Sequence, residues 1–158
     1  MTYYDLPEKN LLAIKTLKEL KASGYAPIGI KDELRKNLLS SFQEGKSVFE
    51  GIWGYEHTVI PDIERAILAR HNINFLGLRG QAKTRIARMM VLLLDEWIPV
   101  VQGSELNDDP LRPISHYALA KLKDEGDEMA ISWLHRDERY TEKLATPDVS
   151  IADLIGDV

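Results

Sequence analysis

The sequence contains no cysteine, which excludes disulfide bonds and thiolate metal sites and is typical of a reducing compartment. It also has no excess of positive charge, since 20 basic side chains are set against 25 acidic ones and give a formal net charge of -5. A polyanionic partner is therefore disfavoured, and we expect no nucleic-acid partner and no anionic membrane surface.

Long hydrophobic runs are missing as well. The longest, Met89 to Leu94, is much shorter than the roughly 20 apolar residues that cross a bilayer. The first ten residues lack the basic segment and apolar run of a secretory signal. With 44% hydrophobic and 28% charged residues, the composition is that of one globular domain or of a piece of a larger one. We expect a cytoplasmic protein.

The N-terminal part has the pattern of two amphipathic helices. Residues 8–23 carry apolar side chains at helical spacing with lysines on the other face: Leu11, Ile14, Leu17 and Leu20. Residues 31–43 predict a second helix, whose apolar face holds Leu34, Leu38 and Phe42. We expect an N-terminal helical segment over residues 1–45 and a second unit over residues 46–158.

The centre of the chain predicts a strand, a glycine loop, a helix and a second strand. A helix near residues 60–70, with Pro61 in its first turn, precedes them. Residues 73–76 are too few for a helix and predict a short buried strand, and residues 83–97 and 98–101 predict the helix and the next strand. This order is a βαβ unit and indicates an α/β fold. A polar, irregular excursion and a helix over residues 115–125 are expected after it.

The loop between the first strand and its helix reads GLRGQAKT, from Gly77 to Thr84. A phosphate-binding loop needs a strand aimed at the ligand, converging backbone amides and a helix N-terminus facing the charge. In such a loop the amides from Gly80 to Thr84 form the cradle, and Lys83 neutralises the β- and γ-phosphates. The Thr84 hydroxyl is then a ligand of the Mg²⁺ ion that bridges those phosphates.

Ala82 stands where the usual phosphate-loop pattern has glycine. Its methyl group is acceptable if the residue has a negative φ and costly if φ is positive, so this residue tests the local geometry. The alternative interpretation is a glycine-containing strand-to-helix turn with an incidental Lys-Thr pair. The expected strand before the loop and helix after it favour nucleotide binding.

Three stretches together resemble the MoxR and magnesium-chelatase ATPase-subunit branch of the AAA+ ATPases. They are GLRGQAKT at 77–84, IWGYEHTVIPDIERAILA at 52–69 and TPDVSIADLIG at 146–156, and the resemblance covers roughly residues 48–158. In that branch alanine commonly precedes the lysine. The resemblance implies a P-loop NTPase core of three αβα layers, preceded here by the N-terminal helical segment.

The resemblance also implies the residues of a nucleotide site. The segment Ile52, Trp53, Gly54 and Tyr55 matches the one that lies against the adenine base. Residues expected to bind ATP in the loop, with Lys83 contributing to catalysis and Thr84 holding Mg²⁺, are Gly77, Gly80, Gln81, Ala82, Lys83, Thr84 and Arg85. The plain alternative is that Trp53 and Tyr55 are hydrophobic anchors for their loop.

Other expected AAA+ parts do not follow Val158, among them a Walker B motif, a sensor residue, an arginine finger and the helical lid. We therefore expect the N-terminal half of a core that binds ATP and Mg²⁺ without efficient hydrolysis by itself. The intact family members imply a ring, expected to be hexameric, which remodels a partner or inserts a metal, often with a von Willebrand type A domain protein. The alternative is a non-catalytic interaction module with a relic loop.

Polar clusters elsewhere are interpreted as structural. Asn107, Asp108 and Asp109 have the oxygen ligands of a metal site, but Asn-Asp-Asp-Pro is also strong turn chemistry. His135 lacks a second histidine at ligand spacing and lies in a run that alternates charge like a solvated face. His57 and His71 flank a helix and need no catalytic role. The resemblance makes Asp148 and Asp153 candidates for pore or partner contacts.

Overall fold

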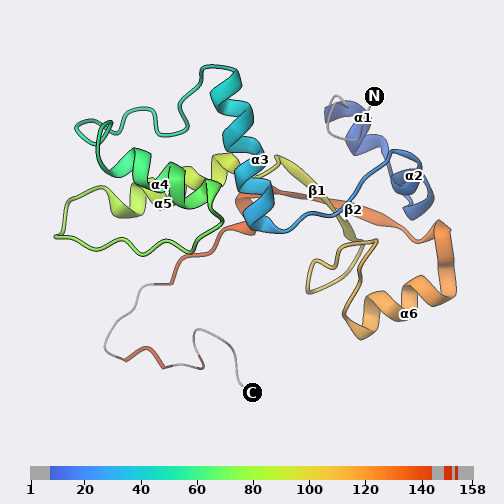
Figure 1. The fold of residues 1–158 in the computed structure, drawn as a ribbon. Coiled ribbons are helices and arrows are strands. Elements are labelled where there is room, and N and C mark those ends of the chain that lie inside the picture. Colours follow the sequence, from blue (N-terminus) through green and yellow to red (C-terminus); the bar gives the residue numbers. More distant parts are fainter. Residues whose placement is uncertain (1–7, 144–147, 151, 153–158) are drawn as a thin grey trace.

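The computed structural model describes residues 8–143, 148–150 and 152 (Figure 1). A pair of strands, β1 (Trp97–Val101) and β2 (Ile131–His135), lies between two groups of helices. One group contains α1 (Glu8–Ala13), α2 (Leu17–Ala22) and α6 (His116–Glu125), and the other contains α3 (Ile30–Gln43), α4 (Val59–Leu68) and α5 (Lys83–Met89). Three 3₁₀ helices extend α5, α6 and β2, respectively: η2 (Met90–Leu93), η3 (Gly126–Glu128) and η4 (Arg136–Arg139).

The helix predicted over residues 8–23 is divided in two, so the prediction of one continuous helix is wrong. Thr16 caps α2, because its Oγ1 accepts a hydrogen bond from Glu19 N and the Glu19 carboxylate accepts one from Thr16 N, both at 3.3 Å. Thr16 also forms an isolated antiparallel bridge with Ala130. Its extended backbone serves both contacts and interrupts the helix.

The helices α3, α4 and α6 confirm the predictions for residues 31–43, 60–70 and 115–125, with small shifts at their ends. Periodicity also predicted much of what they bury, although Phe42 of α3 is exposed. The helix predicted over 83–97 is shorter, since α5 passes into a 3₁₀ turn at Met90. One hydrophobic core joins this group of helices and holds Leu38, Phe49, Ile52, Ile60, Ile63, Ile67, Ile86 and Leu93.

The strand predicted over residues 73–76 does not form within the described part of the chain. Residues 71–78 have no regular secondary structure, and no backbone hydrogen bond joins residues 72–81 to another described segment. Ile73 and Phe75 nevertheless pack against the core, whereas Leu76 is 86% exposed. The apolar pattern was recognised correctly, but a strand also requires a partner for its backbone groups.

The partner of β1 is β2, which was not predicted. The two strands are antiparallel, with Trp97 opposite His135 and Val101 opposite Ile131. The predicted βαβ unit is therefore wrong for the described residues, because its first strand is unpaired and its second pairs with a later, antiparallel one. The three-layer P-loop core stays a prediction, since one strand pair neither requires nor excludes it.

The polar excursion after β1 is irregular, as predicted, and Asp108 organises it. Its Oδ1 accepts hydrogen bonds from Ile114 N at 2.7 Å and Ser115 N at 2.9 Å, and its Oδ2 accepts one from the Ser104 hydroxyl. Burial of the carboxylate opposes ionisation, but these hydrogen bonds outweigh it and lower the pKa of Asp108. Asp108 therefore has a structural role, because it fixes the backbone that leads into α6. The Ser115 side chain caps that helix.

Candidate phosphate-binding loop

The loop from Gly77 to Thr84 leads directly into α5, which begins at Lys83. Its backbone has positive φ values at three positions, 154° at Gly77, 80° at Gly80 and 55° at Ala82. Gly77 has a second reason to be glycine, because a Cβ added there would lie 2.2 Å from Gln81 Oε1. The side chain of Gln81 therefore crosses over the backbone of Gly77 and closes the loop.

Ala82 has φ 55° and ψ 11°, a left-handed conformation immediately before the lysine. The sequence left open whether its methyl group is tolerated or costly, and this positive φ identifies the costly alternative. Ala82 also packs against the hydrophobic core, so its methyl group regains part of that cost by burial. The conformation itself is the one that the more usual glycine would adopt without strain.

The Lys83 side chain folds back across the loop. Its Nζ donates hydrogen bonds to the carbonyl oxygens of Gly77 at 3.0 Å and Leu78 at 2.5 Å. The ammonium group is thereby held inside the loop in which an anion would bind. An incoming phosphate would replace these two neutral acceptors with charged oxygens, so that the ammonium group gains an ion pair in addition to its hydrogen bonds.

Thr84 and Arg85 follow Lys83 on the first turn of α5, and Arg85 lies close to a neighbouring loop. Thr84 is exposed on the first turn of α5. Arg85 reaches the loop before α4, since a Cβ added at Gly51 would lie 3.0 Å from Arg85 Nη2. The segment expected to contact adenine, which begins at Ile52, therefore lies beside the start of α5.

The segment from Ile52 to Tyr55 is part anchor and part exposed surface. Ile52 is buried in the core and Tyr55 packs against it, as the anchor interpretation expects. Trp53, however, is 84% exposed and does not act as an anchor. Gly54, the next residue, has a φ of 84°, which allows the chain to turn there. Trp53 lies at the edge of a depression of about 350 Å³, which is lined by Ser47, Phe49, Glu50, Gly51, Ile52, Trp53, Glu56 and Ile60.

The sequence around the loop is basic, opposite in sign to the net charge of the whole chain, although Arg65, Arg70 and Arg88 form ion pairs with Asp62, Asp32 and Glu142. Between Arg65 and Leu94 the sequence has no aspartate or glutamate but carries six basic residues: Arg65, Arg70, Arg79, Lys83, Arg85 and Arg88. This stretch includes the loop and all of α5. The net charge of -5 concealed the pattern, although a charge count taken segment by segment could have found it.

The other polar clusters support structural roles. Asp109 accepts hydrogen bonds from the Tyr25 hydroxyl at 2.8 Å and from Leu111 N at 2.8 Å. His135 makes an edge contact with Trp97, and its Nδ1 faces the Asp137 backbone amide. Within the described ranges no group of three or more histidine or acidic side chains is arranged to hold a metal ion. Asp153 lies outside the described residues, while Asp148 is exposed.

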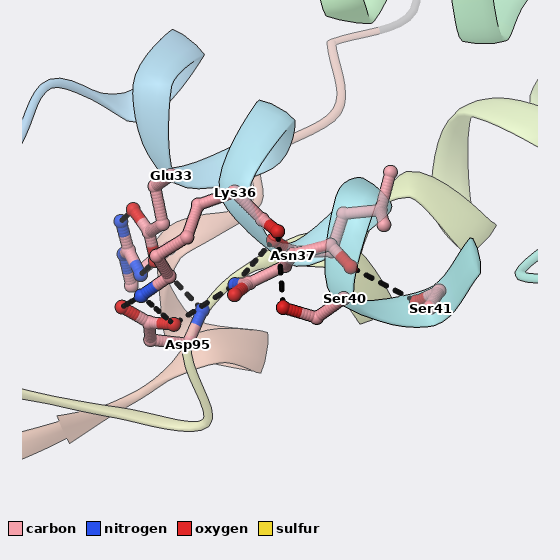
Figure 2. A network of polar contacts seen from close by, with 8 residues as sticks. Glu33, Lys36, Asn37, Ser40, Ser41 and Asp95 are labelled. Atoms are coloured by element: carbon pink, nitrogen blue, oxygen red, sulfur yellow. Dashed lines mark hydrogen bonds and ion pairs between the residues drawn. The ribbon is translucent and has the colours of Figure 1, made fainter. Parts of the chain in front are cut away.

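Sequence reasoning missed a buried polar network that fixes this group of helices (Figure 2). Glu33 of α3 is 3% exposed and forms a bidentate pair with Arg139 of η4, with both N to O distances 2.6 Å. The Arg139 side chain is therefore not solvated, although the charged stretch in which it lies suggested a solvent-exposed face. Glu33 also accepts a hydrogen bond from Asp95 N at 2.7 Å, and the Asp95 carboxylate binds Lys36 and Asn37.

Comparison with known proteins adds no assignment: no family model matches the chain, and neither the curated proteins nor the solved structures give a match. Among the described residues, no helix is both long and apolar enough to cross a membrane.

Proposed function

We propose that the loop from Gly77 to Thr84 binds the phosphates of ATP with Mg²⁺. The observation that carries this proposal is the backbone around Lys83. The left-handed conformation of Ala82 directly precedes the helix, and the lysine ammonium lies against the carbonyl groups of the same turn. An incidental glycine turn has no need of a strained alanine at this point.

The charge of the region supports an anionic ligand. No acidic residue lies between positions 65 and 94 of the sequence, so Lys83 and its basic neighbours face no local carboxylate from that stretch. Within the described chain, the hydrogen-bond partners of the Lys83 ammonium are neutral carbonyl groups. A phosphate that displaces them therefore need not compete with an ion pair.

The proposed roles follow from these positions. Lys83 binds the β- and γ-phosphates, and the amides from Gly80 to Thr84 donate to phosphate oxygens. The Thr84 hydroxyl binds Mg²⁺, and the base lies in the depression beside Trp53. Arg85 connects this depression to the phosphate site through its position beside Gly51. These residues supply binding and charge neutralisation, which are only part of what phosphoryl transfer requires.

At the level of the whole protein, the proposal is a MoxR or magnesium-chelatase-like AAA+ ATPase. Such an ATPase would act as a ring, expected to be hexameric, and would couple ATP to remodelling or metal insertion on a partner, for example one with a von Willebrand type A domain. This part rests on the resemblance of the sequence motifs. The alternative, a non-catalytic interaction module, is favoured by the exposed apolar side chains of Leu76, just before the loop, and Leu78, within it.

Thermal unfolding of the full chain with and without millimolar Mg·ATP separates the two functions. A ligand at about 100 times its dissociation constant stabilises the folded state by about 2.7 kcal/mol, so ATP should raise the midpoint clearly. Lys83→Ala should lose the shift, whereas Lys123→Ala, a matched change on the distant helix α6, should keep it. A folded wild-type chain with no shift would favour the interaction module.

A further inference from the structure

An apolar groove of about 440 Å³ lies among α3, α4 and α5, outside the loop from Gly77 to Thr84. Segments far apart in the sequence form its walls, and six of the apolar side chains that line it are Leu34, Ile67, Phe75, Ala87, Met90 and Val91. Grooves of this volume with mostly apolar walls and a few polar groups are typical binding sites for small molecules. The polar groups that line it therefore indicate which chemistry such a molecule would have.

The polar lining of the groove is basic. Among the described residues, four basic side chains and no aspartate or glutamate line it: Lys31, Arg70, His71 and Arg139. Both terminal nitrogens of Arg139 are already used by the buried Glu33. Arg70 uses only its Nε, which donates to Asp32, and Lys31 forms no ion pair with a described residue. The groove thus offers an unneutralised cation to a ligand.

Hydrogen-bond donors without protein partners gather at one end of the groove. Lys31 lies on the first turn of α3, residues 70–72 follow the C-terminus of α4, and the ion pair of Arg70 with Asp32 joins these two segments. Within the described chain, the Lys31 ammonium, the Arg70 terminal nitrogens and the side chains of His71 and Asn72 have no hydrogen-bond partner. All four residues are exposed, so a ligand in the groove can reach these donors.

We propose that this groove binds a small apolar carboxylic acid, with its hydrocarbon chain against Phe75 and Met90 and its carboxylate between Lys31 and Arg70. The terminal nitrogens of Arg70 can donate to both oxygens of one carboxylate. Asp32 already balances the charge of Arg70, which leaves the fixed charge of Lys31 for the ligand. A single negative charge balances it, whereas a phosphate dianion would exceed it. The groove shares no lining residue with the proposed nucleotide site, and this inference does not rest on ATP binding.

Octanoate and octan-1-ol, which have the same chain length, are the probes. In the full chain with isotopically labelled methionine methyl groups, octanoate should shift the NMR signal of Met90, which lines the groove. The signal of Met129, which is buried in the core of the other helix group, should stay in place. From hexanoate to octanoate the affinity should rise by about fourfold for each added methylene group, as burial in an apolar groove requires. Octan-1-ol should bind at least fivefold more weakly than octanoate.

Lys31→Ala tests the carboxylate end of the groove. Because Lys31 is exposed on the first turn of α3, the variant should retain the wild-type circular dichroism spectrum. It should bind octanoate at least fivefold more weakly and octan-1-ol as the wild type does, whereas Lys123→Ala on α6 should bind both probes like the wild type. An unmoved Met90 signal, equal affinities for the two probes, or a Lys31→Ala variant that binds octanoate normally would overturn the proposal, whatever the outcome of the ATP measurements.

Discussion

Ala82 combines a left-handed backbone with an L side chain directly before Lys83. The left-handed region costs a residue with a Cβ about 1–2 kcal/mol, and only glycine escapes this cost. Phosphate loops with the usual glycine avoid that strain. In this chain the surrounding loop and the packing of the Ala82 methyl group hold the residue in place.

Ala82→Gly should therefore stabilise the protein by less than about 1 kcal/mol, because the relief of about 1–2 kcal/mol of backbone strain is partly offset by about 0.5–1 kcal/mol of added chain entropy and by the lost methyl packing. Urea unfolding measures the change in the free energy of unfolding. Ala87→Gly, in the interior of α5, is the matched control and should destabilise by about 1 kcal/mol. If both substitutions destabilised to the same extent, Ala82 would not be strained.

Asp108 makes a pH dependence predictable at a single residue. Its pKa is lowered in the folded protein from the ordinary value of 3.8, because Ser104, Ser115 and two backbone amides donate to the ionised carboxylate. The stabilisation is fully present above about pH 4 and is lost as the pH falls toward the folded-state pKa, since below pH 4 the unfolded chain binds a proton that the folded chain does not.

Asp108→Asn should accordingly lower stability at pH 7 and flatten the loss of stability below pH 4. Unfolding by urea at a series of pH values from 7 to 2.5 gives both slopes. Asp124→Asn, an exposed change on α6, should leave the acid slope as it is in the wild type. An acid slope that is the same in Asp108→Asn and wild type would show that this carboxyl is not responsible.

At the scale of elements, Glu33 joins α3 to η4 through its pair with Arg139. The side chains of Glu33 and Arg139 are 3% and 13% exposed, so removal of one charge leaves the other partly buried without its partner. Such broken pairs cost about 3–5 kcal/mol, and the slight exposure of Arg139 places this one near the lower end.

Glu33→Gln should thus destabilise the chain by about 3 kcal/mol, measured by urea unfolding at pH 7. The exposed pair of Asp62 and Arg65 offers the control, because its side chains are 75% and 72% exposed. Asp62→Asn should change stability by less than about 1 kcal/mol. Equal effects of the two substitutions would mean that the buried network does not fix η4 against α3.

The elements differ in how far the sequence could predict them. The helices α3, α4 and α6 have local signals, namely apolar periodicity, Pro61 in the first turn of α4 and a serine cap before α6. Even the break before α2 had a local signal, the Thr-x-x-Glu capping box at Thr16. The prediction of one continuous helix followed the apolar periodicity and passed over this signal.

Elements that depend on distant partners were out of reach. The strand β2 reads ISWLH within a charged stretch, and its pairing with β1 joins residues from 30 positions apart (Val101 and Ile131) to 38 positions apart (Trp97 and His135). The pair of Glu33 and Arg139 spans 106 positions, so no local pattern announces it. The segment 73–76 was overpredicted for the same reason, because apolar alternation does not reveal whether a partner strand exists.

At the scale of the whole molecule, the described residues form two groups of helices with one strand pair between them, and the proposed nucleotide loop lies in the group whose local sequence is basic (Figure 1). The candidate site was located from sequence, because its glycine and lysine spacing is local. Its geometry was not, since the φ of Ala82, the folded-back Lys83 and the exposed Trp53 result from packing around α5.

The most direct test of the phosphate-binding loop is an isothermal titration of Mg·ATP into the full chain and into its Lys83→Ala variant. We predict one nucleotide bound per wild-type chain, no detectable binding by Lys83→Ala, and unchanged binding by Lys123→Ala. Equal binding by wild type and Lys83→Ala would place any nucleotide elsewhere. A folded wild-type chain that binds no Mg·ATP would contradict the proposed function.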